Sequence, residues 1–424
     1  MPAHLSQIVI WTATWVLCIL VFLLILWRPG RVPEYVWASG GAVLLVLFRL
    51  LSPSIAWSAV KAGSSVYMFL AGMMLLAELA RQHGVFDWLA AVAMENARGS
   101  QFRLFVLVYI IGFAVTALLS NDATAVLLTP AVLAVVRRAR TSPLPYLFAC
   151  AFIANAASFF LPISNPANLV VFDGLLPTLG QWMHMFFLPS ACAILVTFVI
   201  LWWRSRAELQ PALCAGVRPP SLAAVGRRAA AGILLAAAAL LTTSALGGPV
   251  GPATATAGLA VMLLVAGTNW RIMIAALRQM SWGILPLVAG LFVLVEALKR
   301  VGALSLSAHG LKAAAAWPPV AAFCTSAFSI GIGANAINNL PMGLLAASAV
   351  NAAHGTPGMH AAVLLGIDLG PNLCVTGSLA TILWLIALRR ENIEVSGWRF
   401  LKAGILIMPS TLLLAAVVLA YTLH

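Results

Sequence analysis

The sequence predicts an all-α polytopic membrane protein made of two inverted repeats of five spans, with about ten transmembrane helices plus two hairpins. Each repeat is expected to contain a re-entrant hairpin and a broken helix. Three observations lead to this prediction: the composition, an internal repeat, and polar residues that interrupt apolar segments. Of the 424 residues, 62% are hydrophobic and 8% are charged, against roughly 25% charged in soluble domains.

Apolar stretches near the roughly 20 residues that a helix needs to cross a bilayer recur along the whole chain. We expect spans at residues 8–27, 35–51, 65–81, 145–172, 185–203, 229–246, 249–267, 283–298, 361–388 and 403–423. The first span is expected to be retained, because it lacks a basic leader and is followed by Arg28 and Pro29 instead of a small-residue cleavage site.

An internal repeat divides the chain. "AGMMLLAELARQHGVF" from Ala71 aligns without a gap with "AGLFVLVEALKRVGAL" from Ala289, at an offset of 218. The alignment pairs Glu78 with Glu296, Asn121 with Asn339, and, after a five-residue shortening of the second copy, Asn155 with Asp368, Asn165 with Ser378 and Asn168 with Thr381. We therefore predict a first repeat at 1–203, a cytoplasmic linker at 204–228 and a second repeat at 229–424.

Each repeat has a polar-tipped hydrophobic hairpin, at about 101–140 and 317–353, followed by a broken helix at about 145–172 and 361–388. A twelve-span model, in which the hairpin arms cross, is the alternative. If both hairpins return to the side they left, 19 of the 24 Lys and Arg residues lie on one side. Arg49, Lys61, Lys299, Arg300 and Lys312 remain on the other side. The positive-inside rule then places both termini outside the cell, and an odd number of spans per half makes the halves inverted.

Polar residues at membrane depth indicate a binding site, because non-helical backbone is tolerated there only inside protein or beside a wet cavity. We expect the helices to unwind at Asn165-Pro166 and Gly370-Pro371, and the hairpin tips at 120–124 and 338–341 to meet them. The predicted substrate-binding residues are Ser120, Asn121, Asn155, Ser164, Asn165, Asn168, Asn338, Asn339, Asn372, Thr376, Gly377 and Ser378. The alternative for any one of them is that it only joins helices by hydrogen bonds.

Asp122 and Asp368 are the acids within these interruptions. An ionised carboxylate at that depth is costly, so each is a candidate proton carrier, the alternative being a structural acceptor at a helix N-terminus. Glu78 and Glu296 lie three residues before Arg81 and Lys299, so we expect a local helix pair at each.

The interruptions contain no Lys or Arg, which favours a small neutral polyhydroxy solute over a multiply charged anion. Cys374 lies in the second break and is interpreted first as packing and second as a soft contact for a thiol-seeking solute. The cysteines are otherwise scattered singly, without zinc or disulfide spacing. The formal charge of +13 is explained by topology, and no nucleic-acid motif accompanies it.

The stretches "LLSNDATAVLLTPAVLAV", "FIANAASFFLPISNPANLVVF", "NNLPM" and "GIDLGPN" followed by "GSLATILWL" resemble the ArsB-type arsenite/antimonite efflux permeases of the ion transporter superfamily. The resemblance covers essentially the whole chain. It implies export of arsenite or antimonite as neutral hydroxides against inward protons, metalloid resistance, and ten spans divided between a scaffold and a mobile transport subdomain. It also implies a bacterial inner-membrane location and, in some cases, an ArsA-type ATPase partner; no enzyme activity or cofactor is expected beyond the proton motive force.

The chain departs from that family at two places: Leu373-Cys374-Val375-Thr376 replaces Leu-Thr-Pro-Ile, and Asn155 stands where relatives often have Asp. Silicic acid transport and sodium-coupled carboxylate transport within the same superfamily are the alternatives. Other functions considered are an intramembrane aspartyl protease, which the residues before Asp122 and Asp368 disfavour, and a passive channel. A homo-oligomer is also compatible with the sequence.

Overall fold

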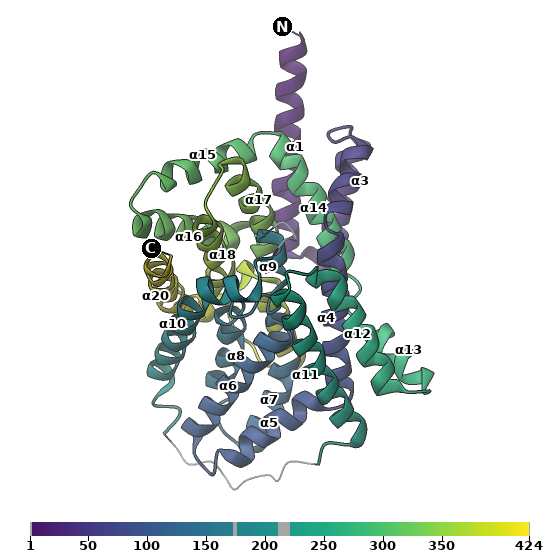
Figure 1. Ribbon diagram of the computed structural model, residues 1–424, viewed down its shortest axis with the longest axis vertical. Helices are drawn as coiled ribbons and strands as arrows, with labels where there is room; N and C mark the ends of the chain where they lie inside the picture. Colours follow the sequence, from purple (N-terminus) through teal and green to yellow (C-terminus); the bar gives the residue numbers. More distant parts are fainter. Residues whose placement is uncertain (1, 173–175, 211–220, 424) are drawn as a thin grey trace.

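The computed structural model describes residues 2–172, 176–210 and 221–423, which fold into helices joined by short connections (Figure 1). Eight helical segments in these ranges are long and apolar enough to cross a membrane. They are Gln7–Trp27, Ser64–Gln82, Gln101–Leu118, Leu179–Ser205, Ala224–Ala245, Trp270–Arg300, Pro319–Ile337 and Gly397–Thr422. The predicted class, an all-helical protein with many spans, is confirmed.

The elements of the first half are α1 (Pro2–Trp27), α2 (Glu34–Leu47), α3 (Pro53–Ala62), α4 (Ser64–Gln82), α5 (Val85–Asn96), α6 (Gln101–Leu118), the wide turn η2 (Ala123–Leu128), α7 (Thr129–Arg138), α8 (Leu144–Ala156), α9 (Pro166–Val171) and α10 (Leu179–Ser205). Side chains define several of the starts. Ser100 accepts a hydrogen bond from the Arg103 amide at α6, and Thr178 with Gln181 forms a capping box at α10.

The elements of the second half are α11 (Ala224–Ala245), α12 (Val250–Ala266), α13 (Trp270–Gln279), α14 (Ile284–Arg300), α15 (Ala303–Ala315), α16 (Pro319–Ile337), α17 (Asn339–Ala352), α18 (Pro357–Leu369), the short turns η3 (Gly370–Asn372) and η4 (Val375–Gly377), α19 (Leu379–Arg390) and α20 (Gly397–Thr422). The run from α14 to α20 repeats the order of the run from α4 to α10. Part of the predicted linker, 211–220, lies outside the described residues.

The eight long helices differ from the roughly ten predicted spans for a physical reason. The helices α2 and α12 have only 14 and 17 residues, and both broken segments are divided into shorter pieces. Conversely, α6 and α16 are long enough to count as spans, although each is one arm of a hairpin.

Each hairpin ends close to where it began. The Thr141 hydroxyl donates to Gln101 Oε1 at 2.6 Å, which joins the end of the first hairpin to its start. In the second hairpin, Pro319 at the start and Ala353 at the end line one cavity. The helices that lead into the two hairpins, α5 and α15, lie at opposite ends of the molecule (Figure 1). The hairpins therefore approach the centre from opposite ends.

The second long segment of each half packs against the other half: α12 lies against α4, and α2 lies against α14. A Cβ placed on Gly72 of α4 would lie 2.2 Å from the Thr254 carbonyl oxygen of α12. A Cβ on Gly290 of α14 would lie 2.6 Å from the carbonyl carbon of Ala38 of α2. Gly72 and Gly290 are separated by the repeat offset of 218. The same close approach of backbones between the two halves therefore occurs twice, at repeat-related positions.

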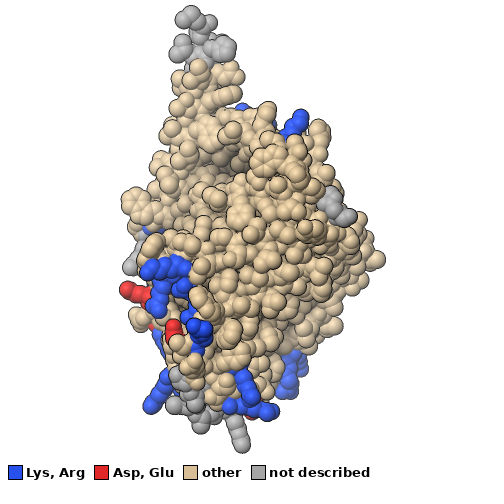
Figure 2. Space-filling model, turned by 90° about the vertical axis from the view of Figure 1, so that its left-hand side faces the viewer, with Lys and Arg blue, Asp and Glu red and all other residues tan. Residues whose placement is uncertain are grey.

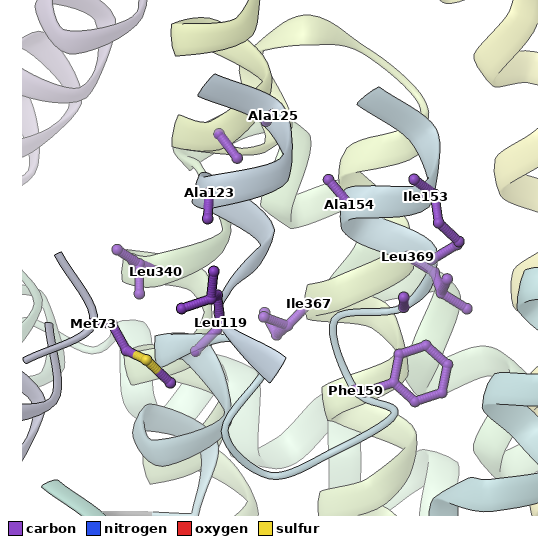
Figure 3. Close-up of a cluster of buried hydrophobic side chains, with 14 of the residues drawn as sticks. Met73, Leu119, Ala123, Ala125, Ile153, Ala154, Phe159, Leu340, Ile367 and Leu369 are labelled. Carbon is purple, nitrogen blue, oxygen red and sulfur yellow. The ribbon is translucent and has the colours of Figure 1, made fainter. Parts of the chain in front are cut away.

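The core surrounds the hairpin tips and the broken helices. Figure 3 shows Leu119 from the first hairpin, Leu340 from the second and Ile367 from α18 in one cluster of buried side chains. Beside α8, the rings of Phe152 and Phe400 stack with centroids 4.7 Å apart. Apolar packing thus holds the segments whose backbones are not helical.

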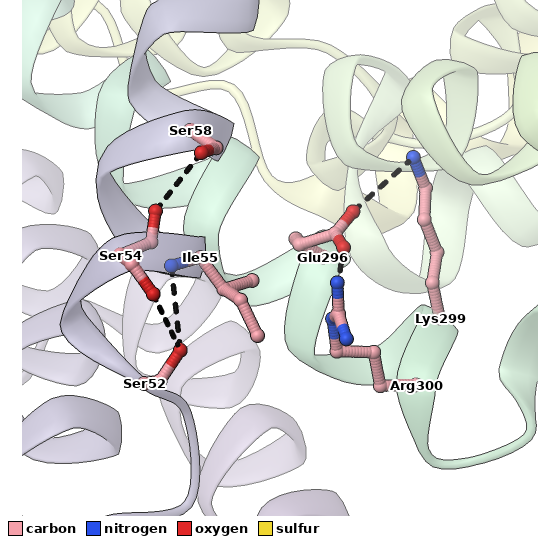
Figure 4. Close-up of polar contacts among 7 residues, drawn as sticks. All are labelled: Ser52, Ser54, Ile55, Ser58, Glu296, Lys299 and Arg300. Atoms are coloured by element: carbon pink, nitrogen blue, oxygen red, sulfur yellow. Dashed lines mark hydrogen bonds and ion pairs between the residues drawn. The ribbon is translucent and has the colours of Figure 1, made fainter.

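Basic residues gather toward one end of the molecule. Figure 2 shows most of the visible Lys and Arg along the left side and the bottom of its lower half, a few near the top, and a large tan surface elsewhere. At that end Arg137 of α7 pairs with Glu391 after α19 at 2.9 Å. The opposite end carries Glu296, which pairs with Arg300 at 3.0 Å and Lys299 at 3.9 Å beside Ser54 and Ser58 of α3 (Figure 4). The topology was predicted from this unequal distribution of Lys and Arg between the two ends.

Candidate functional site

The two helix breaks form the centre of the site, and both are longer than expected. The first break runs over residues 157–165, because α8 already ends at Ala156 and α9 begins at Pro166. The predicted unwinding at Asn165-Pro166 is the end of this break, which already begins after Ala156. Proline lacks an N–H and fits the first position of a helix, so Pro166 starts α9, while Asn165 Oδ1 accepts the Ala167 amide at 3.0 Å.

The second break runs over residues 370–378, between α18 and α19. Here the expected position was right, since α18 ends immediately before Gly370-Pro371. Ser378 caps α19 by accepting the Ala380 amide at 3.2 Å, as Asn165, its partner in the repeat, caps α9. A Cβ on Gly377 would lie 2.6 Å from Pro371 Cα. Glycine is needed there because the backbone approaches so closely.

Hydrogen bonds tie the two breaks together across the repeat. Asn165 Nδ2 donates to Asp368 Oδ1 at 2.7 Å. Asn155 Nδ2 donates to Asn372 Oδ1 at 3.0 Å and lies 3.4 Å from Thr381 Oγ1. Asn155 and Asp368, which the repeat pairs, thus each reach the opposite broken helix.

The first hairpin tip docks on the first break. The Asn121 amide donates to the Ser164 carbonyl at 3.1 Å, and the Ser164 hydroxyl donates to the Ala117 carbonyl at 3.2 Å. Within the tip, Ser120 Oγ accepts the Ala123 amide at 3.1 Å, and Asn121 Oδ1 accepts the Asp122 amide at 2.9 Å. These bonds hold Ser120, Asn121 and Asp122 in one tight turn.

The second tip docks on the second break in the same way. Asn338 Nδ2 donates to the Thr376 carbonyl at 3.3 Å, and Asn338 Oδ1 accepts the Leu340 amide at 3.4 Å. Asn338 has a φ of 77° and a ψ of 154°, a strained backbone conformation that is otherwise found almost only in glycine. Asn339 follows it as a buried side chain.

The Asn168 side chain mainly stabilises the backbone of the first break. Its Nδ2 lies 3.1 to 3.3 Å from the carbonyl oxygens of Ser158, Leu161 and Pro162 in the first break. Its Oδ1 has no hydrogen-bond partner within the described part of the chain. The donor side of this amide is therefore committed to the backbone of the first break.

Asn335 is a central residue that the sequence analysis missed. Its Nδ2 donates to the Gly331 and Gly370 carbonyls, both at 2.8 Å, and its Oδ1 accepts the Cys374 amide at 3.2 Å. Its carbonyl accepts the Thr376 hydroxyl at 3.0 Å. Asn335 lies inside α16 without a neighbouring Gly-Pro or Asn-Pro pair, so no helix-breaking signal marked it.

Cys374 lies in this cluster. Its Sγ is 2.9 Å from Asn335 Oδ1 and 2.9 Å from Thr376 Oγ1. The thiol thus makes local polar contacts, which fits the primary interpretation of Cys374 as part of the packing of the break. Within the described ranges, no group of three or more His, Cys, Asp or Glu residues is placed to bind a metal ion.

The two aspartates occupy different surroundings. Asp368 is 1% exposed, and its Oδ2 has no hydrogen-bond partner among the residues described. Asp122 is half-buried at the first tip and lines a cavity together with Ser120. One carboxylate is therefore enclosed between the broken helices, and the other faces a space.

We call this space the access chamber. Its lining residues come from α4, the first hairpin, the start of α9, the segment from the end of α13 to the start of α14, and α19: Phe69, Leu70, Met73, Met74, Ala77, Glu78, Ser120, Asp122, Ala123, Val126, Leu127, Pro166, Gln279, Met280, Ser281, Ile284 and Leu383. Glu78 is held by Arg81 at 2.9 and 2.6 Å, and Arg81 also contacts the exposed Gln279. The local pairs predicted for Glu78 and Glu296 are both confirmed.

Helices that break around a shared polar site, within a chain of many apolar helices, define a multi-pass membrane transporter. The chain belongs to the citrate transporter family, whose family model matches residues 22–367. This establishes transport as the general function and agrees with the expectation that the chain is not an enzyme.

Individual relatives point in the same direction. The chain is 26% identical to an arsenical pump membrane protein of Escherichia coli, over 96% of this chain and 97% of the relative. It is also 26% identical to an uncharacterized transporter of Mycobacterium tuberculosis, over 90% of this chain and 91% of the relative. The resemblance inferred from the motifs is thereby confirmed along nearly the whole chain.

A solved structure shares the fold. The crystal structure of the YdaH transporter of Alcanivorax borkumensis, described as having an unusual topology, superimposes with a TM-score of 0.58 and 15% sequence identity. The match covers 88% of both chains.

Proposed function

We propose that the chain is a secondary active transporter that exports trivalent arsenite and antimonite as neutral hydroxides in exchange for protons, and so confers metalloid resistance. The observation that carries the proposal is the chemistry of the breaks and tips: amides, hydroxyls and two carboxylates, with no Lys or Arg. Such groups match a small neutral solute that donates and accepts hydrogen bonds. The name of the Escherichia coli relative supports the metalloid as cargo.

Proton coupling is proposed for Asp122 and Asp368. A carboxyl group enclosed in the protein favours its neutral, protonated form. A substrate that hydrogen-bonds to this group can therefore compete with a proton for it. Asp368 is suited to this because its side chain is buried and its Oδ2 has no hydrogen-bond partner in the described part of the chain. The proposed substrate contacts are the unpaired Oδ1 of Asn168 and Nδ2 of Asn372, with the remaining predicted residues shaping the site around them.

A carboxylate is the second candidate cargo, because the family model is described as a citrate transporter. Two carboxylate side chains and the lack of a basic residue in the breaks oppose a multiply charged anion. Silicic acid shares the neutral hydroxide chemistry of arsenite and stays an alternative.

The setting of the transporter follows from the same proposal. We place it in the bacterial inner membrane with both termini outside, driven by the proton motive force without a cofactor. Association with an ArsA-type ATPase and assembly into a homo-oligomer are included as proposed partners.

Cargo identity is tested by uptake into everted membrane vesicles that contain the protein. Arsenite, antimonite, silicic acid and citrate are each offered at the same concentration and measured by mass spectrometry of the vesicle contents. We expect uptake of arsenite and antimonite above that of vesicles without the protein. Uptake of citrate alone, or of silicic acid alone, would overturn the proposed cargo.

A further inference from the structure

Three of the 13 methionines of the chain line the access chamber. Met73 and Met74 belong to α4, and Met280 directly follows α13. They share the chamber with Ser120 and Asp122 of the first hairpin tip. The chamber therefore combines hydroxyl and carboxylate oxygens with three thioether sulfurs.

The chamber extends from exposed residues of the segment after α13 to the first hairpin tip. Gln279 is exposed, whereas Met280 is 7% and Met73 4% exposed. Figure 3 shows the Met73 side chain pointing toward Leu119, the residue before Ser120. A solute in this chamber would therefore have both the methionines and Asp122 within its surroundings.

The repeat provides an internal comparison. At the offset of 218, Met73 and Met74 correspond to Leu291 and Phe292. The cavity beside α14 is lined by Phe292, Val295, Glu296 and residues of the second hairpin, with no methionine among its described lining residues. Of these two repeat-related cavities, thioethers therefore line the one that contains Asp122 and are absent from the described lining of the other, although both have a hydrophobic wall.

We propose that Met73, Met74 and Met280 form a thioether wall that contacts the metalloid atom of the substrate and favours arsenite and antimonite over hydroxides of hard elements. This inference rests on the proposed function. A thioether sulfur is soft and polarisable, as trivalent arsenic and antimony are, whereas silicon is hard. A thioether has no proton to lose, so it touches the metalloid without replacing a hydroxide. The contact is weak and reversible, as release requires.

The test uses the variant Met73→Leu/Met74→Leu/Met280→Leu, because leucine preserves volume and apolarity while removing sulfur. The matched control is Met68→Leu/Met183→Leu/Met273→Leu, which removes three thioethers that do not line the chamber. Initial rates of antimonite and arsenite uptake are measured in everted vesicles. Binding of antimonite to the purified full-length protein is measured by equilibrium dialysis and mass spectrometry.

We expect the chamber variant to raise the KM for antimonite by about fivefold, and that for arsenite by less, with kcat nearly unchanged. The control variant should match the wild type. Equal KM values in wild type and chamber variant, or the same change in both variants, would overturn the thioether wall. If the wild type transports neither metalloid, the proposed function fails, and the binding measurement then decides the inference: weaker binding in the chamber variant alone supports it, and equal or absent binding refutes it.

Discussion

Asp368 and Asn165 show how single residues make the site. Their bond of 2.7 Å joins two broken helices from different halves, and the second Asp368 oxygen is without a partner in the described ranges. The sequence predicted Asn165 because it precedes Pro166 in an apolar stretch, and Asp368 because it is one of two acids within the polar interruptions. Asn335 could not be found in this way, since α16 continues unbroken around it.

We expect Asp368→Asn to reduce concentrative arsenite uptake to near the level of vesicles without the protein. The amide keeps the shape of the side chain but cannot carry a proton. Asp122→Asn should have the same effect if both acids take part in coupling. The control is Glu391→Gln, which alters an exposed ion pair with Arg137. Full proton-driven uptake by both Asn variants would show that neither aspartate couples transport to protons.

We expect Asn335→Ala to destabilise the second break, because it leaves the Cys374 amide without its partner and removes one of the two hydrogen bonds to the Gly370 carbonyl. An unsatisfied buried group costs about 1–3 kcal/mol. The loss should appear as a lower unfolding temperature in detergent and as faster labelling of Cys374 by a thiol reagent. Asn96→Ala, which removes one exposed bond to the Val92 carbonyl, is the control. Unchanged Cys374 labelling in Asn335→Ala would contradict this role.

At the scale of elements, hairpins and broken helices were predictable because helix-breaking or polar residues mark them: the polar tips of the hairpins, and Asn-Pro and Gly-Pro in the broken helices. Their bounds agree with the predictions within a few residues, as in α16 and α17, which cover Pro319–Ala352. The extent of the first break was not predictable. Residues 157–165 are not helical, although most of them are compatible with a helix. The Asn168 side chain donates hydrogen bonds to carbonyl oxygens of this segment and so stabilises its non-helical backbone.

The close packing of α4 against α12 and of α14 against α2 predicts that two small substitutions lower the stability of the protein. Gly72→Ala and Gly290→Ala each place a methyl group into the backbone of a facing helix, and overpacking of this kind typically costs about 1–3 kcal/mol. Both variants should unfold at lower temperature than the wild type in detergent. Gly40→Ala, where a Cβ would meet nothing within 4 Å, should not. Equal stability of all three would contradict the close approach of α4 to α12 and of α14 to α2.

At the scale of the whole molecule, the unequal distribution of Lys and Arg is the basis for predicting both termini outside the cell. The internal repeat predicted two similar halves, and the order of α4–α10 recurs in α14–α20. How the halves interlock was beyond the sequence, because hydropathy shows which segments are apolar but not which apolar faces meet.

The proposed orientation makes a labelling prediction. Asn96→Cys at the end of α5 and Ser54→Cys in α3 are both exposed positions at opposite ends of the molecule. A membrane-impermeant maleimide should label the Asn96 position only in everted vesicles and the Ser54 position only in right-side-out spheroplasts, with labelled peptides identified by mass spectrometry. The reverse pattern would invert the topology, and labelling of both from one side would contradict it.

The central claim is proton-driven export of a trivalent metalloid, and arsenite flux tests it most directly. Everted vesicles containing the protein would be energised with a respiratory substrate, and arsenite uptake followed with and without a protonophore. We predict concentrative uptake that the protonophore abolishes. Uptake that never exceeds vesicles without the protein, although the protein is present and folded, or uptake indifferent to the protonophore, would contradict the claim.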